Sequence, residues 1–431
     1  MSAGTIGLMM FGLLAVLFLM KVPVAYALIL ASIPGVLLSG MPLDILPKRL
    51  FTACDSFTYM AVPFFLLAGT LMSQGGISRR LIAFADALMG RFAGGLGLVS
   101  VASCMFFSAI SGSSAATTAA IGGIMIPEME RRGYDRDFAA AINAAGGTIG
   151  VIIPPSIPFV TYGILTGASV STLFLAGFGP GLLMGLALML VIYVTSRRRG
   201  YGESRKAGWG EIGRSFLHAF LALLMPVIVL GGIYSGKFTP TEAAVIAVAY
   251  GLLVGGLVYR SIDLKSLAGI LKESAVSTAQ ILLLICAANL FGYVLTYNRI
   301  PDMAAAAVLG VSSNKWVILL LIDGIVLLVG TFMDTVASLI ILVPILFPVV
   351  SQLGVNPVHF GMILCVGLAI GMITPPFGCC LFVACGTADL PLEVLTKRVL
   401  PFIGALVAVL LAVTFFEPIS LVLPWLFGAN M

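Results

Sequence analysis

The segment 149–156, IGVIIPPS, places two adjacent prolines in the middle of a long apolar run. A proline inside a helix removes one backbone hydrogen bond and clashes with the preceding turn, at a cost of about 3 kcal/mol. In a bilayer the freed carbonyl groups also have no water to bond. The segment 370–377, IGMITPPF, repeats the pattern. The two segments together predict helices that are broken inside a membrane.

The composition indicates an integral membrane protein. Hydrophobic residues make up 60% of the 431 residues and charged residues only 10%, whereas soluble domains carry about 25% charged residues. The first apolar run, 5–20, lacks the basic start and cleavage site of a signal peptide, so we expect a retained span. The basic residues are too scattered for a nucleic-acid surface, and no phosphate-binding G-x-x-x-x-G-K-[ST] loop is present. The seven cysteines lack paired metal-binding spacing, which favours buried thiols.

Apolar runs of about 20 residues, the length of a spanning helix, recur from end to end. We expect ten spans and two interrupted hairpins, in a first repeat (1–195), a cytoplasmic linker (196–215) and a second repeat (216–431). The first repeat contains spans 5–20, 23–39 and 57–74, hairpin 96–127, span 138–167 broken at Pro154-Pro155, and span 171–195. The second contains spans 216–234, 240–258 and 275–297, hairpin 316–350, broken span 357–388, and span 399–425.

The two repeats share residues that fix backbone geometry. A shift of 221 positions, without a gap, superimposes glycines and prolines of the two halves. Because these residues restrict or free the backbone dihedral angles, their coincidence indicates one backbone shape built twice. The pairs are Pro127 with Pro348, Gly133 with Gly354, Gly146 with Gly367, Gly150 with Gly371, and Pro154-Pro155 with Pro375-Pro376.

The distribution of basic residues predicts the orientation. With the N-terminus outside and each hairpin entering and leaving by one face, 18 of the 23 Lys and Arg residues lie inside and 5 outside. Both termini are then on the outer, periplasmic side. The first hairpin opens to the cytoplasm and the second to the outside, so the two repeats are inverted. Inverted repeats with broken helices at mid-depth are typical of secondary transporters. The predicted fold is an all-α polytopic membrane protein with two inverted repeats, re-entrant hairpins and broken helices.

The hairpin tips carry oxygen ligands suited to sodium. Hydroxyl and carbonyl oxygens of a tip that faces a broken helix can surround a hard cation from both sides. The alternative for such small residues is close helix packing. The first predicted sodium site contains Ser108, Ser111, Gly150, Ile153 and Pro155. The second, by symmetry, contains Gly330, Thr331, Asp334, Gly371, Thr374 and Pro376.

Individual polar residues leave alternatives open. Asp334 aligns with Ser113 at the tips, and it is either a cation ligand at membrane depth or a helix N-cap. Asp323 favours a structural role, and Glu242 favours a capping box with Thr239. Asn143 and Asn289 either contact substrate or bond between helices. The candidate substrate contacts are Ser113, Ser114, Thr117, Asn143, Ser156 and Thr335. Apart from sodium as a coupling ion, we expect no cofactor or metal.

Three motifs together resemble the large membrane subunit of tripartite ATP-independent periplasmic (TRAP) transporters. They are GKFTPTEAAVIAVAYG at 236–251, SAISGSSAATTAAIGGIMIPEM at 108–129 and AAGGTIGVIIPPS at 144–156. The resemblance implies an elevator-type sodium symporter of the wider ion-transporter superfamily, in a bacterial inner membrane. It also implies two partners, a small membrane subunit of about four helices and a soluble extracytoplasmic binding protein. The implied substrates are organic acids such as C4-dicarboxylates, sialic acids, keto acids and sugar acids.

The expected function is sodium-coupled uptake of a small organic anion, with membrane lipid as the surroundings and no enzyme activity. The amphipathic segments 77–92 and 301–314 are the expected arms between a moving domain and a static scaffold. A symporter that works without a binding protein, or a cation/proton antiporter, remains an alternative. An intramembrane aspartyl enzyme built on Asp323 and Asp334 is the other alternative, although the chain lacks a Gly-x-Gly-Asp context.

Overall fold

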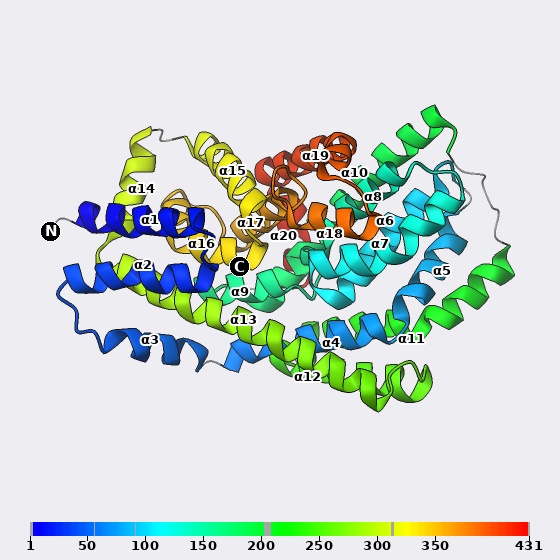
Figure 1. Ribbon diagram of the computed structural model, residues 1–431, viewed down its shortest axis with the longest axis horizontal. Coiled ribbons are helices and arrows are strands. Elements are labelled where there is room, and N and C mark those ends of the chain that lie inside the picture. Colours follow the sequence, from blue (N-terminus) through cyan, green and yellow to red (C-terminus); the bar gives the residue numbers. More distant parts are fainter. Residues whose placement is uncertain (1–2, 56, 91, 202–207, 312–313, 430–431) are drawn as a thin grey trace.

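The computed structural model describes residues 3–55, 57–90, 92–201, 208–311 and 314–429. This described part is built of helices and contains no strand. Eight of its helices are long and apolar enough to cross a membrane. The structure therefore confirms the predicted all-α polytopic membrane fold (Figure 1).

One layer of helices, the scaffold layer, occupies the left side and the lower edge of the molecule in Figure 1. Its long helix α13 packs against α2, α3 and α4, while α12 packs against α4 and α11, and α1 packs against α2. The layer comprises α1 (Ala3–Leu19), α2 (Val24–Leu38), α3 (Ile45–Cys54), η1 (Phe57–Met60), α4 (Ala61–Gln74), α11 (Trp209–Tyr234), α12 (Pro240–Leu252), the π-helix η3 (Leu253–Val258) and α13 (Leu264–Tyr297).

The remaining spans form the hairpin layer. Its first half comprises α6 (Gly95–Ser111), α7 (Ser114–Arg131), α8 (Arg136–Gly147), η2 (Thr148–Val151), α9 (Ile157–Thr166) and α10 (Val170–Arg199). Its second half comprises α15 (Lys315–Phe332), α16 (Thr335–Gln352), α17 (Pro357–Gly371), α18 (Cys379–Ala388), α19 (Leu392–Phe415) and α20 (Pro418–Leu426).

The two halves of the hairpin layer interlock. Helix α7 of the first hairpin packs on α18, beyond the second break, and α16 of the second hairpin packs on α9, beyond the first break. Two amphipathic helices connect this layer to the scaffold layer. They are α5 (Ile77–Met89), which packs on α6 and α11, and α14 (Ile300–Val311), which packs on α16 and α1.

The capping box at the start of α12 confirms the sequence interpretation of Glu242. The Thr239 backbone N–H donates to Glu242 Oε2 at 2.8 Å, and the Glu242 backbone N–H donates to Thr239 Oγ1 at 3.3 Å. Pro240 occupies the first helical position, where a missing N–H costs nothing. Glu242 therefore has a local structural role at this helix start.

Ion pairs at the two ends of α19 show that the hairpins are inverted. Near the start of α19, Arg398 Nε lies 2.6 Å from Oδ2 of Asp137. Asp137 is in the first turn of α8, just after α7 ends, and so marks the end of the first hairpin that lies opposite its tip. Just beyond the end of α19, Glu417 Oε1 lies 2.7 Å from Nζ of Lys315, the first residue of the second hairpin. A helix rises 1.5 Å per residue, so these points are about 25 Å apart along α19. The two hairpins therefore open toward opposite ends of one spanning helix.

Several elements differ from the predictions. Helix α13 begins at Leu264 because the carboxylate of Asp263 accepts from the Ser266 backbone N–H at 2.7 Å and caps it, well before the apolar stretch begins. Helix α3 was not predicted, since it is short and contains charged residues. The predicted span 399–425 is two helices, α19 and α20, separated by Phe416 and Glu417. The predicted linker 196–215 is helical at both ends, and 202–207 lie outside the described residues.

Replacing Arg398 by alanine is expected to destabilise the hairpin layer by about 1–3 kcal/mol, because the largely buried carboxylate of Asp137 loses its ion-pair partner. The side chain of Asp137 is only 18% exposed, and Arg398 also lies 3.6 Å from Asp135. The thermal unfolding of purified protein measures the effect. The control is Arg131→Ala, because that side chain is 79% exposed and 3.8 Å from Glu128. Equal unfolding temperatures for both variants would contradict the prediction.

Candidate cation and substrate site

The tip of the first hairpin rests directly on the first helix break. Helix α6 ends at Gly112, whose φ of +61° is a left-handed conformation that favours glycine. A Cβ atom on Gly112 would lie 2.8 Å from the carbonyl oxygen of Pro155, and one on Gly150 would lie 2.6 Å from that of Ser113. Tip and break thus approach backbone to backbone, which requires glycine on both sides.

The hydroxyl groups of this tip form a compact buried network. Ser111 Oγ lies 2.8 Å from Thr117 Oγ1, and Thr117 Oγ1 donates to the Ser113 carbonyl at 2.8 Å. Ser114 Oγ donates to the Thr148 carbonyl at 3.2 Å and so joins the tip to η2. Deeper in α6, Ser108 Oγ donates to the Cys104 carbonyl at 2.6 Å. The tip therefore presents several oxygen atoms in a small volume.

The break itself is equally buried. Ile153 is 7% exposed, and Pro155 is buried with its carbonyl against the tip. Ser156 caps α9, because its Oγ accepts from the Phe159 backbone N–H at 3.4 Å, and it also donates to the Val151 carbonyl at 2.6 Å. The peptide bond between Pro154 and Pro155 is cis, as is the one between Pro375 and Pro376.

The second tip repeats the contact with the second break. A Cβ atom on Gly371 would lie 2.5 Å from Cα of Gly330, closer than side chains approach in proteins. Thr335 Oγ1 lies 3.2 Å from the Met372 sulfur and joins α16 to the break. Thr374 Oγ1 donates to the Ile370 carbonyl at 2.9 Å, and Thr331 Oγ1 donates to that of Leu328 at 2.7 Å.

Asp334 caps α16, one of the two roles that its sequence context predicts. Its Oδ1 accepts from the backbone N–H groups of Val336 at 2.7 Å and Ala337 at 3.3 Å. Both bonds use Oδ1, so Oδ2 remains for another partner. Capping and cation binding are therefore compatible at this residue.

The two tips differ in access. Asp334 is exposed, as is Pro376 in the facing break, whereas Ser111 and Pro155 in the first half are buried. In the second half, the exposed rings of Phe332 and Phe377 lie 5.5 Å apart, centroid to centroid. At the second tip Asp334 is thus exposed, whereas Thr331 and Thr335 are buried.

Other polar residues bond between helices. Asn143 Oδ1 accepts from Ser100 Oγ at 2.8 Å and its Nδ2 donates to the Ala139 carbonyl at 2.9 Å, so both ends of this fully buried amide are satisfied. Thr414 Oγ1 donates to Asp323 Oδ2 at 3.0 Å and joins α19 to α15. At the membrane edge, the hydrogen bond from Lys315 holds the pKa of Glu417 below its usual range. These groups stabilise the hairpin layer.

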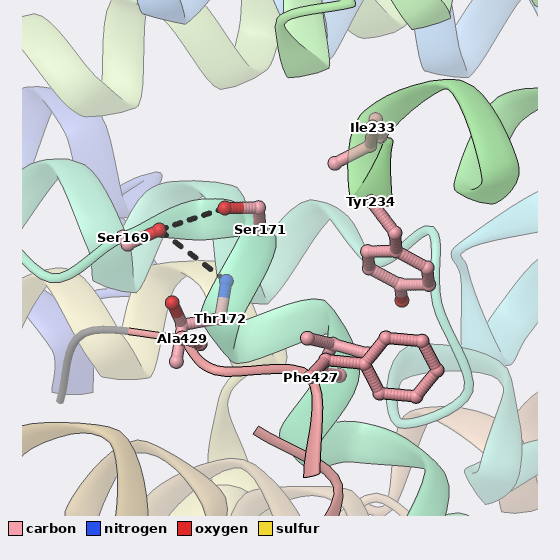
Figure 2. A pocket seen from close by; sticks show the side chains of 8 residues that line it. Ser169, Ser171, Thr172, Ile233, Tyr234, Phe427 and Ala429 are labelled. Carbon is pink, nitrogen blue, oxygen red and sulfur yellow. Dashed lines mark hydrogen bonds between the residues drawn. The ribbon is translucent and has the colours of Figure 1, made fainter. Parts of the chain in front are cut away.

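Two cavities lie at the border between the layers. One, of about 360 Å³, is lined by Ser169, Ser171 and Thr172 at the start of α10 and by Tyr234 at the end of α11 (Figure 2). The ring of Phe427, beyond α20, faces Tyr234 at 6.1 Å between centroids. The other, of about 460 Å³, lies between α13 and α16. Neither is lined by a predicted sodium ligand.

Comparison with known proteins shows one consistent family. The sequence profile of the family described as "Tripartite ATP-independent periplasmic transporter, DctM component" matches residues 11–419. The chain is 46% identical to the isethionate TRAP transporter permease protein DctMQ of Oleidesulfovibrio alaskensis, over 96% of this chain and 65% of that protein. It is 41% identical to the sialic acid TRAP transporter large permease protein SiaM of Vibrio cholerae, over 97% and 98% of the two chains.

A solved structure shares the fold at low sequence identity. The YdaH transporter of Alcanivorax borkumensis superimposes with a TM-score of 0.66 at 17% identity, over 88% of this chain and 90% of that one. At this identity the similarity concerns the fold alone.

Proposed function

Because the chain belongs to the DctM family of tripartite ATP-independent periplasmic transporters, we propose that this large permease takes up a small organic anion together with sodium. The observation that carries the proposal is the doubled contact between a hairpin tip and a helix break. Gly112 meets Pro155 in one half, and Gly330 meets Gly371 in the other. Each contact gathers carbonyl and hydroxyl oxygens beside the start of a half-helix.

The electrostatics of the half-helices suit an anion bound together with cations. Ser113 and Asp334 begin α7 and α16, and the amino ends of these helices carry partial positive charge. A carboxylate that entered this depth alone would lose its hydration without compensation. We therefore expect sodium to bind before the anion or with it, at Ser108, Ser111 and the first break, and at Asp334, Thr374 and the second break.

An elevator movement of the hairpin layer against the scaffold layer fits the small contact between them. On the scaffold side, a Cβ atom on Gly69 of α4 would lie 3.2 Å from the Ser111 carbonyl oxygen at the first tip. Nearby, the rings of Phe65 and Phe174 meet edge to face at 6.3 Å. Helices α5 and α14 join the layers and would bend during the movement. The absence of side-chain atoms on Gly69 would let the tip slide past.

The proposed assembly contains two further proteins, a small membrane subunit of about four helices and an extracytoplasmic binding protein. The binding protein would deliver the anion at the face predicted to lie outside, in a bacterial inner membrane. Relatives named for isethionate, sialic acid and C4-dicarboxylates suggest carboxylates and sulfonates as substrates. The binding protein would select among them.

The test is uptake into proteoliposomes that contain the permease and its small subunit, with loaded binding protein outside. An inward sodium gradient should drive accumulation of isethionate, sialic acid or a C4-dicarboxylate, and replacing sodium by potassium should abolish it. Accumulation without sodium would overturn the coupling. Accumulation without the binding protein would favour a symporter that works alone.

Thr374→Ala is expected to weaken sodium binding at the second break by about 10-fold, because one oxygen ligand is lost. The half-saturating sodium concentration for uptake should rise, and high external sodium should partly restore the rate. Thr374→Ser keeps the hydroxyl that donates to the Ile370 carbonyl and should behave like wild type. Ser111→Ala should have a similar effect at the first tip. A sodium dependence unchanged in both alanine variants would count against the assigned ligands.

A further inference from the structure

The cavity of about 460 Å³ combines walls from both layers. Its volume is in the range of small-molecule sites, about 300–1,000 Å³. It lies near Arg49, which is among the five basic residues predicted to lie on the outer side. Its polar lining consists of Arg49 from α3, Asn289, Tyr293 and Thr296 from α13, and Asp302 from α14, and α16 supplies an apolar wall.

Arg49 is held in this cavity by an aromatic ring. Its guanidinium carbon lies 3.6 Å from the centroid of the Tyr293 ring. Within the described part of the chain, no carboxylate lies within ion-pair distance of Arg49, whereas Lys48 beside it is paired with Asp44 at 2.6 Å. A stacked guanidinium keeps its N–H edge free for an oxo-anion, which it can bind through two hydrogen bonds.

The other polar groups define what the cavity can bind. Thr296 Oγ1 donates to the Gly292 carbonyl at 2.8 Å, so its proton is committed and it can only accept. The exposed amide of Asn289 carries N–H donors. Asp302 also lines the cavity, and its negative charge opposes an anion. The donors for an anion are therefore Arg49 first and Asn289 second.

We propose that this cavity is a transit site for the transported organic anion on the outer side, with Arg49 binding its carboxylate or sulfonate group. The inference rests on the proposed function and adds a second anion site to it, apart from the hairpin tips. Because α13 and α16 belong to different layers, their relative movement would change the shape of the cavity. The anion would thus be held here only before its transfer to the tips.

The test uses a reporter inside the cavity itself. Thr296→Cys places a thiol in the wall, and its rate of alkylation by an uncharged maleimide is measured in proteoliposomes of neutral phosphatidylcholine. The candidate anions are isethionate, sialic acid and a C4-dicarboxylate. The anion that the wild type accumulates is then titrated in the alkylation assay. We expect this anion to slow alkylation.

Two charge variants in the Thr296→Cys background should shift the protection in opposite directions. Arg49→Gln should raise the half-protecting anion concentration about 10-fold, because a charged hydrogen bond is lost. Asp302→Asn should lower it, because a repulsive charge is removed. The matched control is Lys48→Gln, which neutralises the neighbouring residue outside the cavity and should leave protection unchanged. Because Asp302→Asn is expected to tighten binding, a folding defect in the arginine variant cannot account for both results.

A lipid phosphate would offer Arg49 the same oxygen atoms, and the vesicle composition separates the two sources. If anionic phospholipid slows alkylation and the soluble anion adds nothing, the site binds lipid and the proposal is overturned. Equal protection in the Arg49→Gln and Lys48→Gln variants would also overturn it. If sodium drives uptake but the anion does not protect the thiol of Thr296→Cys from alkylation, only this cavity site is refuted. A wild type without sodium-driven uptake refutes the proposed function itself.

Discussion

Replacing Asp334 by asparagine is expected to lower sodium-dependent uptake by about 10- to 100-fold while the second hairpin stays folded. Asparagine caps a helix about as well as aspartate, so the two bonds from the Val336 and Ala337 N–H groups to Oδ1 can be kept. The change removes the charge and the carboxylate oxygen Oδ2, which is available to a cation. Losing one charged ligand costs about 1.5–3 kcal/mol, which gives this range. The measurement is the sodium dependence of uptake in proteoliposomes.

The control is a capping aspartate far from the tips. Asp263 also caps a helix, because its Oδ1 accepts from the Ser266 N–H at 2.7 Å at the start of α13. Asp263→Asn should leave the sodium dependence unchanged. Asp334→Ala removes cap and charge together and should additionally lower the unfolding temperature. If Asp334→Asn kept the wild-type sodium dependence, Asp334 would be a helix cap and nothing more.

The hairpin tips were predictable because the residues that shape them act locally. Ser113 and Asp334, aligned by the shift of 221 positions, both cap the second helix of their hairpin. Gly150 and Gly371, aligned by the same shift, both lie where a side chain would collide with a tip. Prolines and glycines restrict or free the backbone wherever they occur, so their repetition in the sequence is repeated in the structure.

The packing between the layers could not be read from the sequence. Gly69 contacts the first tip, but the apolar sequence around Gly69 has no feature that distinguishes it from other apolar spans. Likewise, Arg398 and Asp137 are separated by 261 positions, and nothing local marks them as partners. The cavity beside Arg49 depends on α3, which is too short and too polar for a hydropathy criterion to detect. Long-range contacts of this kind depend on shape, and one sequence carries little information about shape.

The difference in exposure between the two tips was also not predicted from the sequence. The predictions treat the sites as equivalent by symmetry, yet Asp334 of the second tip is exposed, whereas Ser111 of the first tip is buried. If the hairpin layer moves as proposed, its inverted halves face opposite sides of the membrane, and a single conformation exposes them unequally. The sequence repeat therefore specifies the local backbone shape of each site. How exposed each site is depends on the conformation of the whole chain.

Gly371→Ala is expected to abolish uptake almost completely, which is the largest structural effect we predict for one added methyl group. The new Cβ atom would lie 2.5 Å from Cα and C of Gly330, and a backbone cannot give way as a side chain does. Overpacking of a dense interior costs about 1–3 kcal/mol. Here the collision would separate the tip of the second hairpin from the break and pull apart the oxygen ligands of the proposed second sodium site. Uptake and the unfolding temperature are measured on the same preparation.

The control is Gly386→Ala on α18, the half-helix that follows the same break. A Cβ atom there meets no other atom within 4 Å, and alanine favours a helix over glycine by about 1 kcal/mol. This variant should transport normally and unfold at an equal or higher temperature. Gly150→Ala, whose Cβ atom would lie 2.6 Å from the Ser113 carbonyl oxygen, should match Gly371→Ala. Normal uptake by either the Gly371→Ala or the Gly150→Ala variant would mean that contact between tip and break is dispensable, and the proposed sodium sites would then have to lie elsewhere.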